Sequence, residues 1–375
     1  MKYYIIAGEA SGDLHGSNLI RELKKPDPAA LIRCWGGDKM QEAGGQLVKH
    51  YRDLAFMGFT EVLMNLRTIL HNLKVCKEDI LQFKPDAIIL IDYPGFNLRI
   101  AKWAKQHGFK VIFYISPQVW AWKENRVKSM KLNIDKMLVI LPFEKDYFKN
   151  KWDWEVEYVG HPLVEVVDEF RASSRRSKAS DSRLPTNNSR LIALLPGSRK
   201  QEILKKLPVM LEVSKDFPDH QFIVAQAPAI PDDFYKLFTD RYPNVRIAKD
   251  KTYDLLLHAD AALVTSGTAT LEAALFGVPE VVCYKGSLIS YQIARRVIKV
   301  KYISLVNLIM DKIVVKELIQ DQLTVENLRT ELNQLLTNKE KIALLHRDYD
   351  DLKKLLSQVG NASAKAAQSI FSFIS

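Results

Sequence analysis

Short apolar runs alternate with helical patterns along most of the chain, and this alternation restricts the possible fold more than any other feature of the sequence. The apolar runs are rich in β-branched and aromatic residues and are of strand length: Tyr3–Ala7, Ala87–Ile91, Val111–Ile115, Met137–Leu141, Leu191–Leu195, Phe222–Ala225 and Ala261–Val264. The helical patterns between them are Ser17–Lys24, Thr68–Phe83, Leu98–His107, Lys205–Lys215 and Thr270–Phe276. Near-continuous apolar strands separated by amphipathic helices predict an α/β fold with buried parallel sheets and helices on both faces.

The length of the chain predicts two such domains. A chain of 375 residues is long for a single hydrophobic core. Residues 171–190 are rich in serine, arginine and asparagine and lack large apolar side chains, which is typical of a linker. We therefore expect a first domain at 1–165, a linker at 166–190, a second domain at 191–340 and a helical tail at 341–375. The tail should pack on the first domain or on a partner subunit, because its apolar face needs cover.

Composition excludes several classes of protein. No apolar run approaches the roughly 20 residues that span a bilayer, and the N-terminal segment lacks a secretory signal pattern. The three cysteines are far apart and have no metal-binding spacing, so neither a disulfide nor a metal site is expected. The net charge of +10 suits nucleic acid, anionic lipid or a phosphorylated substrate, and composition alone does not choose among them.

Two motifs in the second half are typical of phosphate-binding turns. In "LLPGSRKQEI" a strand ends in glycine and Arg199 just before a helix, where free N–H groups and a guanidinium suit an anion. In "SGTATLEAALFGVP" a strand ends in Ser266, Gly267 and Thr268 at another helix start. Each motif alone also fits an ordinary strand-to-helix turn. Together they favour nucleotide binding, although the GxGxxG fingerprint of dehydrogenases is absent.

Glu272 lies inside the second of these motifs, where it would repel a phosphate. A carboxylate at this place suits a ribose diol, as acidic residues do in dinucleotide sites. The alternative is an acid near a helix N-terminus that the helix dipole favours.

The first half carries polar residues at two strand ends. "IIAGEASGDLHGSNLI" places Glu9, Ser11, Asp13 and the second-rank candidate His15 after the first strand, where two acids suit sugar hydroxyls better than phosphate. Asp92 follows the strand 87–91 and is a candidate general base if burial raises its pKa, although a turn aspartate before proline is the simpler alternative.

Aromatic and apolar residues extend this pattern. Trp120 and Trp122 follow the next strand and suit either a core or a wall against a sugar or acyl chain. The segment 56–70 is rich in Phe, Met and Leu and fits either an interfacial amphipathic segment or a core helix.

Taken in order, the motifs resemble those of the lipid-A-disaccharide synthase family over about residues 3–320. The matching stretches are "GEASGD", "MGFTEVL", "DYPGFN", "SPQVWAW", "VGHPL", "LPGSR", "SGTATLEAALFGVP", "LVNLI" and "VKELIQ". The resemblance implies a GT-B glycosyltransferase with two doubly wound Rossmann-like domains facing a central cleft. It also implies an inverting transfer, without metal or other cofactor, from UDP-2,3-diacylglucosamine to 2,3-diacylglucosamine 1-phosphate (lipid X). The products are the β-1,6-linked disaccharide 1-phosphate and UDP.

The resemblance also assigns roles to residues. The UDP donor would be held in the second domain by Arg199, Ser266, Gly267, Thr268, Thr270, Glu272, Asn307 and Gln320. Asp92 would be the general base. The acceptor and lipid side, in the first domain, would be lined by Glu9, Ser11, Asp13, Met57 and Glu61.

The expected location is the cytoplasmic face of the inner membrane, where the basic charge would favour an anionic surface. Nucleic acid is not expected as a partner, and the sequence leaves the oligomeric state open, a homodimer included. Two other functions remain open. A UDP-sugar epimerase of the same fold would not need the apolar 56–70 segment, and a non-enzymatic basic peripheral membrane protein would not need the two phosphate-type turns.

Overall fold

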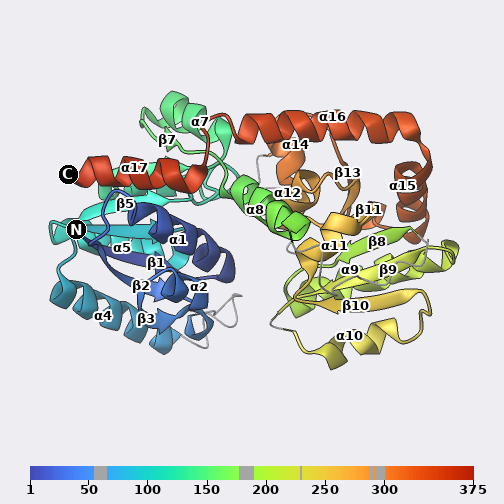
Figure 1. Ribbon diagram of the computed structural model, residues 1–375, viewed down its shortest axis with the longest axis horizontal. Coiled ribbons are helices and arrows are strands. Elements are labelled where there is room, and N and C mark those ends of the chain that lie inside the picture. Colours follow the sequence, from blue (N-terminus) through green and yellow to red (C-terminus); the bar gives the residue numbers. More distant parts are fainter. Residues whose placement is uncertain (55–65, 177–189, 229, 288–290, 292–299) are drawn as a thin grey trace. The chain divides into compact units, whose positions relative to one another are not determined.

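The computed structural model describes residues 1–54, 66–176, 190–228, 230–287, 291 and 300–375 (Figure 1). The chain divides into two compact units. The first comprises Met1–Pro162 together with Leu356–Ser375, and the second comprises Leu163–Leu355.

The first unit contains a seven-stranded parallel sheet in the order β3-β2-β1-β4-β5-β6-β7. Its strands are β1 (Lys2–Ala7), β2 (Leu31–Gly36), β3 (Gln46–His50), β4 (Ala87–Ile91), β5 (Lys110–Tyr114), β6 (Lys136–Val139) and β7 (Glu157–Tyr158). The chain runs outward from β1 to one edge and then returns to continue from β4 to the other. This order is that of a doubly wound sheet.

Alternating side chains of the buried strands face two different helical layers. Tyr4 and Ile6 of β1 belong to a core with α4 (Leu66–Phe83), α5 (Pro94–Gln106), α6 (Arg126–Asn133) and α7 (Pro142–Trp152). Tyr3 and Ile5 face α1 (Ala10–Leu23) and α2 (Asp38–Glu42) on the opposite side. Because successive side chains of a strand point to opposite faces, a fully apolar strand requires both layers.

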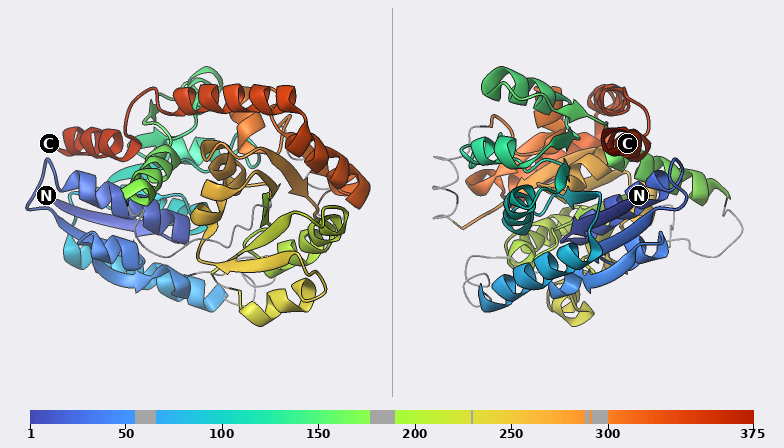
Figure 2. Two further views of the ribbon diagram at one scale, coloured as in Figure 1. Left: turned by 45° about the vertical axis from the view of Figure 1, so that its right-hand side comes forward. Right: turned by 90° about the vertical axis from the view of Figure 1, so that its left-hand side faces the viewer.

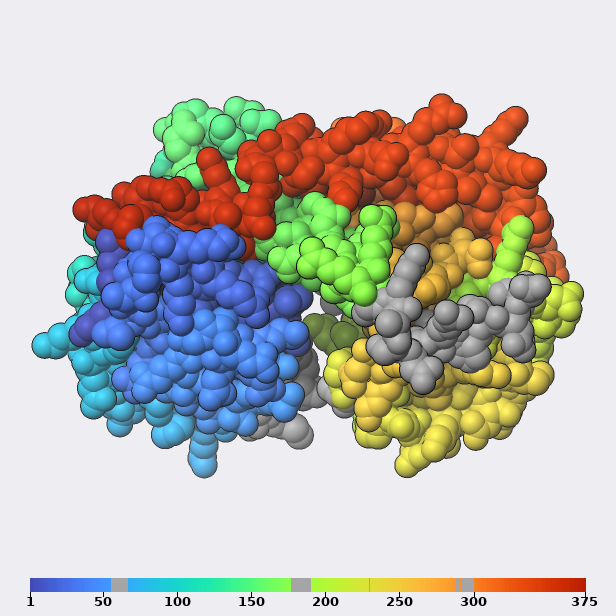
Figure 3. Space-filling view, in the orientation of Figure 1, coloured from blue at the N-terminus to red at the C-terminus, as the bar shows by residue number. Residues whose placement is uncertain are grey.

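The C-terminal helix α17 (Ala362–Ile374) completes the second of these layers. Ala366, Ala367 and Ile370 are buried in the same core as α1, and the views in Figure 2 show α17 beside α1. In the space-filling view α17, in red, lies on the blue surface of the first unit (Figure 3). The end of the chain is therefore part of the first unit's core.

The second unit contains a six-stranded parallel sheet in the order β10-β9-β8-β11-β12-β13. Its strands are β8 (Leu191–Leu195), β9 (Gln221–Gln226), β10 (Val245–Lys249), β11 (Ala261–Thr265), β12 (Glu280–Tyr284) and β13 (Lys316–Ile319). Its helices are α8 (Pro162–Arg176), α9 (Lys200–Val213), α10 (Asp232–Thr239), α11 (Thr252–His258), α12 (Thr268–Leu275), α14 (Leu305–Met310), α15 (Val325–Thr337) and α16 (Lys339–Leu356). Two doubly wound parallel sheets confirm the predicted α/β class.

The unit boundaries differ from the predicted ones in two places. Helix α8 occupies 166–176, the first part of the expected linker, because Leu163, Val166 and Val167 form a buried face on it. The rest of that linker, 177–189, lies outside the described residues. The expected single tail, 341–375, is two helices, and α16 stays with the second unit because Tyr349 and Leu352 are buried there.

Candidate functional site

In both sheets most of the candidate residues follow the two strands at which the winding reverses. These strands are the adjacent pairs β1 and β4 in the first unit and β8 and β11 in the second. Ligands of open α/β sheets bind outside the carboxyl ends of the strands at such points. Each unit therefore has one candidate site, which we describe separately.

The loop after β4 has an unusual backbone. Asp92 and Tyr93 are consecutive non-glycine residues with positive φ angles of 44° and 49°, a conformation that costs roughly 1–2 kcal/mol per residue. The Asn97 side chain stabilises it by donating from Nδ2 to the carbonyl oxygens of Asp92 (2.8 Å) and Ile91 (3.2 Å). This arrangement fixes the Asp92 carboxylate at the end of the sheet, as strained residues at active sites often are.

Tyr93 is held on both sides. Its hydroxyl donates to the carbonyl oxygen of Leu54 at 3.0 Å. Its ring lies against Gly8, where an added Cβ would be only 2.3 Å from Tyr93 Cγ. Gly8 is therefore required because nothing larger than hydrogen fits under the tyrosine.

Asp92 has the protonation behaviour that the sequence interpretation required. Burial, together with a smaller contribution from the negative charge of Glu9, raises the pKa of Asp92 to about 7, against a lowering contribution from a hydrogen bond with the Tyr93 backbone. A carboxylate with a pKa near neutrality is suited to general base catalysis at neutral pH.

The other candidate residues expected in a loop after β1 lie mostly on a helix. Helix α1 begins at Ala10, so Ser11, Asp13 and His15 are helical, where a ligand loop was expected. Ser11 is exposed. The Asp13 carboxylate is buried and accepts hydrogen bonds from the backbone N–H groups of Gly37 (2.7 Å) and Met40 (3.1 Å) at the start of α2. Asp13 therefore stabilises α2, and its carboxylate is already engaged in the unit.

His15 is buried on the opposite face of α1 from solvent, and burial lowers its pKa to about 4. The ring is therefore neutral at physiological pH. Met57 and Glu61, predicted on the acceptor side, lie outside the described residues, as does most of the 56–70 segment.

The two tryptophans have different environments. Trp120 donates from Nε1 to the buried Glu144 carboxylate at 3.1 Å and packs edge-on against Phe143. Glu144 also accepts from the backbone N–H of Leu141 at the start of α7. Trp122 is 47% exposed. Trp120 is therefore held in place, whereas nearly half of Trp122 remains exposed to solvent.

In the second unit, the turn after β8 is occupied by an internal anion. Gly197 has a φ of +115°, and the Ser198 N–H donates to the Glu202 carboxylate at 3.3 Å. Arg199 is 60% exposed, with its guanidinium 3.9 Å from the same carboxylate. A carboxylate thus lies where the sequence predicts a phosphate, which shows that the turn accommodates an oxyanion.

The turn after β11 divides into open and engaged residues. Gly267 (φ +146°) and Thr268 are exposed, and an added Cβ on Gly267 would meet no atom within 4 Å. The Ser266 hydroxyl donates to the carbonyl oxygen of Ile303 (2.7 Å), and the buried Thr270 hydroxyl donates to that of Gly267 (2.8 Å). Gly267 and Thr268 are therefore open to a ligand, whereas Ser266 and Thr270 shape the turn.

Glu272 lies on the first turns of α12 and is half-buried. Its Oε1 accepts a hydrogen bond from the Tyr253 hydroxyl at 3.0 Å, and burial raises its pKa. Tyr253 packs against Phe170 and Phe276, with ring centroids 5.4 and 5.3 Å away. An aromatic cluster thus orients the carboxylate that the sequence assigns to a ribose.

Asn307 is part of an internal network. Its side chain is 1% exposed, its Nδ2 donates to Val315 O and Glu317 Oε1 (both 2.9 Å), and its Oδ1 accepts from the N–H groups of Val314 and Val315. The amide has no remaining hydrogen-bonding capacity for the predicted donor contact. In this structure Asn307 organises the segment before β13.

Gln320 follows β13 with a positive φ of 53°. Its Oε1 accepts from the Gly286 N–H at 3.0 Å, and its buried Nε2 has no hydrogen-bond partner among the residues with a described position. An unpaired buried amide of this kind is rare in native proteins, so Nε2 is a candidate donor to a ligand.

The residues that hold the site were not predicted. Asn97, Glu144, Tyr253 and Glu202 position Asp92, Trp120, Glu272 and the β8 turn, respectively. The sequence signal available was weak, because a single polar residue on a helix has no distinguishing pattern. Only Glu202, three residues after Arg199, follows a spacing that suggests contact.

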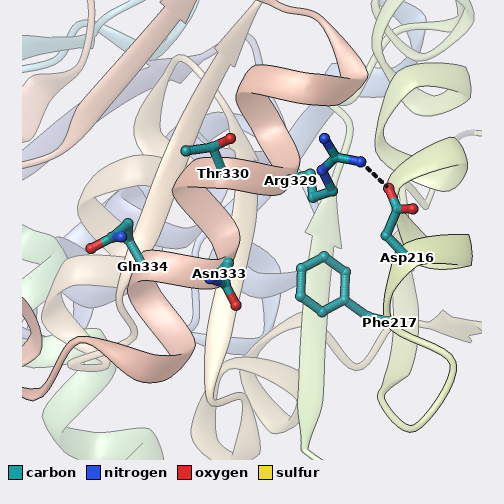
Figure 4. Close-up of a pocket in the computed structure, with 6 residues that line it drawn as sticks. All are labelled: Asp216, Phe217, Arg329, Thr330, Asn333 and Gln334. Atoms are coloured by element: carbon teal, nitrogen blue, oxygen red, sulfur yellow. Dashed lines mark ion pairs between the residues drawn. The ribbon is translucent and has the colours of Figure 1, made fainter.

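A shallow pocket in the second unit is unrelated to these turns. It is lined by Asp216, Phe217, Arg329, Thr330, Asn333 and Gln334 (Figure 4). Phe217 follows α9, whose C-terminal end lies at the amino-terminal edge of the sheet. This pocket is therefore at the opposite edge from the β8 and β11 turns.

Neither a membrane-spanning helix nor a metal-binding cluster is found in the parts of the chain that the structure describes. No helix there is long and apolar enough to cross a bilayer. No group of three or more histidine, cysteine or acidic residues there is arranged to hold a metal ion.

Sequence comparison finds relatives that match most of this chain. A family model described as lipid-A-disaccharide synthetase matches residues 3–371. A lipid-A-disaccharide synthase of Syntrophus aciditrophicus is 39% identical over 372 residues, which cover 98% of this chain and 96% of the relative. Another, of Geobacter metallireducens, is 41% identical over 337 residues, covering 88% and 87%.

Structural comparison shows the fold. A UDP-GlcNAc 2-epimerase from Neisseria meningitidis, solved with UDP-GlcNAc, is similar with a TM-score of 0.69 and 14% identity, over 99% of this chain and 100% of the other. The glycotransferase of kitacinnamycin gives a TM-score of 0.69 and 15% identity, over 100% and 99%. At such identities these two structures establish the GT-B fold, which epimerases and glycosyltransferases share.

Proposed function

The chain belongs to the lipid-A-disaccharide synthetase family, and we propose that it joins UDP-2,3-diacylglucosamine to 2,3-diacylglucosamine 1-phosphate. The reaction forms a β-1,6-linked disaccharide 1-phosphate and releases UDP. Relatives that match nearly the whole chain and bear the synthase name support this activity over that of the epimerases, whose likeness is one of fold alone.

The second unit is proposed to bind the UDP donor. Its turn after β11 offers the backbone N–H groups of Gly267 and Thr268, and its turn after β8 offers the exposed Arg199 guanidinium and, once the Glu202 carboxylate is displaced, the Ser198 N–H. These donors would stabilise the negative charge that develops on the leaving diphosphate. Glu272 would accept hydrogen bonds from the ribose, and the unpaired Gln320 Nε2 would donate a hydrogen bond to the UDP-sugar.

The first unit is proposed to activate the acceptor. The ionised Asp92 carboxylate would take the proton from the 6-hydroxyl as that oxygen attacks the anomeric carbon of the donor sugar. The bond from this carbon to the diphosphate breaks as the new bond forms on the opposite face, and the electron pair leaves with UDP. Attack from the opposite face inverts the anomeric centre.

One observation carries this proposal above the others. Asp92 combines a strained, rigidly held backbone with a pKa of about 7 at the carboxyl end of β4. A turn aspartate that merely capped α5 would need neither feature, and the N-cap residue of α5 is Tyr93, with no side-chain hydrogen bond capping the helix.

The lipid substrates imply a place of action. We propose that the protein binds peripherally to the cytoplasmic face of the inner membrane, drawn by its charge of +10 to anionic lipid. A homodimer is compatible with this proposal, which does not depend on it.

The test is UDP release from UDP-2,3-diacylglucosamine with and without the acceptor, using wild type and Asp92→Asn. Release that requires the acceptor and collapses in the variant, with UDP binding retained in calorimetry, supports both the transfer and the base. Release without acceptor would favour an epimerase or hydrolase. Full activity of the variant would remove Asp92 from its role.

A further inference from the structure

Two cationic side chains of the first unit lie over the exposed ring of Trp122, and a third lies close to one of them. Lys123 Nζ lies 4.2 Å from the centroid of the Trp122 ring, and the Arg126 guanidinium carbon lies 5.9 Å from it. Arg99, on α5, is close enough to Arg126 to lower its pKa by charge repulsion, after burial. We call Arg99, Trp122, Lys123 and Arg126 the basic cluster.

The positive charge of the basic cluster is not compensated within the described residues. None of its three cations has a carboxylate within ion-pair distance there. Glu124, the acid nearest in sequence, instead accepts a hydrogen bond from the Tyr147 hydroxyl and pairs with Lys151. Repulsion within the cluster adds to burial in lowering the pKa of Lys123, with Arg126 as its source.

The local backbone makes it still less favourable to hold these cations together. Lys123 has a positive φ of 55°, which is unfavourable for a lysine. Arg126 is the first residue of α6, where the helix dipole disfavours a cation. A protein that keeps three cations in such a place, with no counter-charge among the described residues, is suited to bind an anion there.

The basic cluster is linked to the candidate base through α5, which carries Arg99 and begins at Pro94, directly after Asp92 and Tyr93. The positive charge of Arg99 acts on Tyr93, opposing the rise that burial causes in the tyrosine pKa. Tyr93 adjoins Asp92 in the chain. The cluster and the base therefore belong to one region of the first unit.

We propose that the basic cluster binds the phosphate monoester of the acceptor, with the Trp122 ring against its sugar. This inference rests on the proposed function. In that reaction the donor diphosphate is assigned to the second unit, so the acceptor phosphate is the remaining anion. Guanidinium groups bind phosphate oxygens through paired hydrogen bonds, and a tryptophan face suits the apolar face of a sugar.

The test measures discrimination between two acceptors in detergent, 2,3-diacylglucosamine with and without its 1-phosphate, using Arg99→Gln and Arg126→Gln. Each variant should raise KM for the phosphorylated acceptor roughly 10- to 100-fold, the range for loss of a hydrogen bond between charged groups. KM for the acceptor without the phosphate and KM for the UDP donor should change little. Lys128→Gln, which removes an exposed charge from the same helix, is the matched control and should behave like wild type.

Two outcomes would overturn the inference. Unchanged discrimination, with UDP binding and circular dichroism like wild type, would show that the phosphate is bound elsewhere. Loss of binding to phosphatidylglycerol vesicles, with discrimination intact, would assign the cluster to membrane lipid. Failure of the proposed function itself would differ from both, because wild type would then release no UDP in response to either acceptor.

Discussion

The ring of Tyr93 lies directly on Gly8, so that the loop after β4 is supported by the loop after β1. A methyl group on Gly8 would come within 2.3 Å of the ring. Since these loops carry Asp92 and Glu9, the same contact sets the geometry between the two carboxylates.

Gly8→Ala should therefore reduce turnover strongly. The added methyl would displace Tyr93 and, with it, Asp92, and misplacing a catalytic group by about 1 Å can cost on the order of 100-fold in rate. Gly95→Ala is the matched control, because an added Cβ on Gly95 meets no atom within 4 Å. Acceptor-dependent UDP release measures the effect. Near-wild-type turnover of Gly8→Ala would show that the contact with Tyr93 is not needed for catalysis.

The activity should depend on the ionisation of Asp92. The base functions only when deprotonated, so kcat/KM for the acceptor should rise with pH through a midpoint of about 7. Because the Glu9 charge raises this pKa, Glu9→Gln should move the midpoint to lower pH. Glu42→Gln, at an exposed position, should leave it unchanged. An unchanged midpoint in Glu9→Gln would show that the Glu9 charge does not affect the pKa of Asp92.

The positions of the motifs could be predicted from the sequence because they depend on local pattern. An apolar run that ends in Asp92 or in Ser266 places those residues at the carboxyl end of a buried strand, whatever surrounds it. The parallel sheets follow from the same runs. In contrast, Leu31–Gly36 and Gln46–His50 include charged or polar residues and gave no strand signal.

The partners of individual side chains could not be predicted, since they come from distant parts of the chain. Asp13 looked like a ligand residue, but its carboxylate meets the backbone of Gly37, 24 residues away. Glu272 owes its orientation to Tyr253, 19 residues before it. No periodicity in one sequence encodes such pairs, which depend on how the helices pack on the sheet.

Tyr253→Phe tests the role of that orientation. The substitution keeps the ring contacts with Phe170 and Phe276 and removes only the hydrogen bond to Glu272. UDP affinity should fall roughly three- to tenfold, about the effect of one ordinary hydrogen bond, because the substitution loosens the orientation of Glu272 and leaves its carboxylate in place. Tyr242→Phe removes an equivalent bond to Glu212, away from the β8 and β11 turns, and should not affect UDP affinity. Calorimetry that finds equal UDP affinity in Tyr253→Phe and wild type would exclude this role for Tyr253.

Asn307→Ala distinguishes a structural role from the ligand contact that the family resemblance implies. The substitution removes four internal hydrogen bonds and leaves the N–H groups of Val314 and Val315 without their acceptor. The free energy of unfolding should fall by about 3 kcal/mol, since each unpaired buried group costs about 1–3 kcal/mol. Urea denaturation measures this loss, with Asn333→Ala, an exposed position on α15, as the control. UDP binding of the folded fraction should change little, because the amide has no capacity left for the donor. A variant of unchanged stability that no longer binds UDP would instead mean that Asn307 leaves its internal partners to contact the nucleotide.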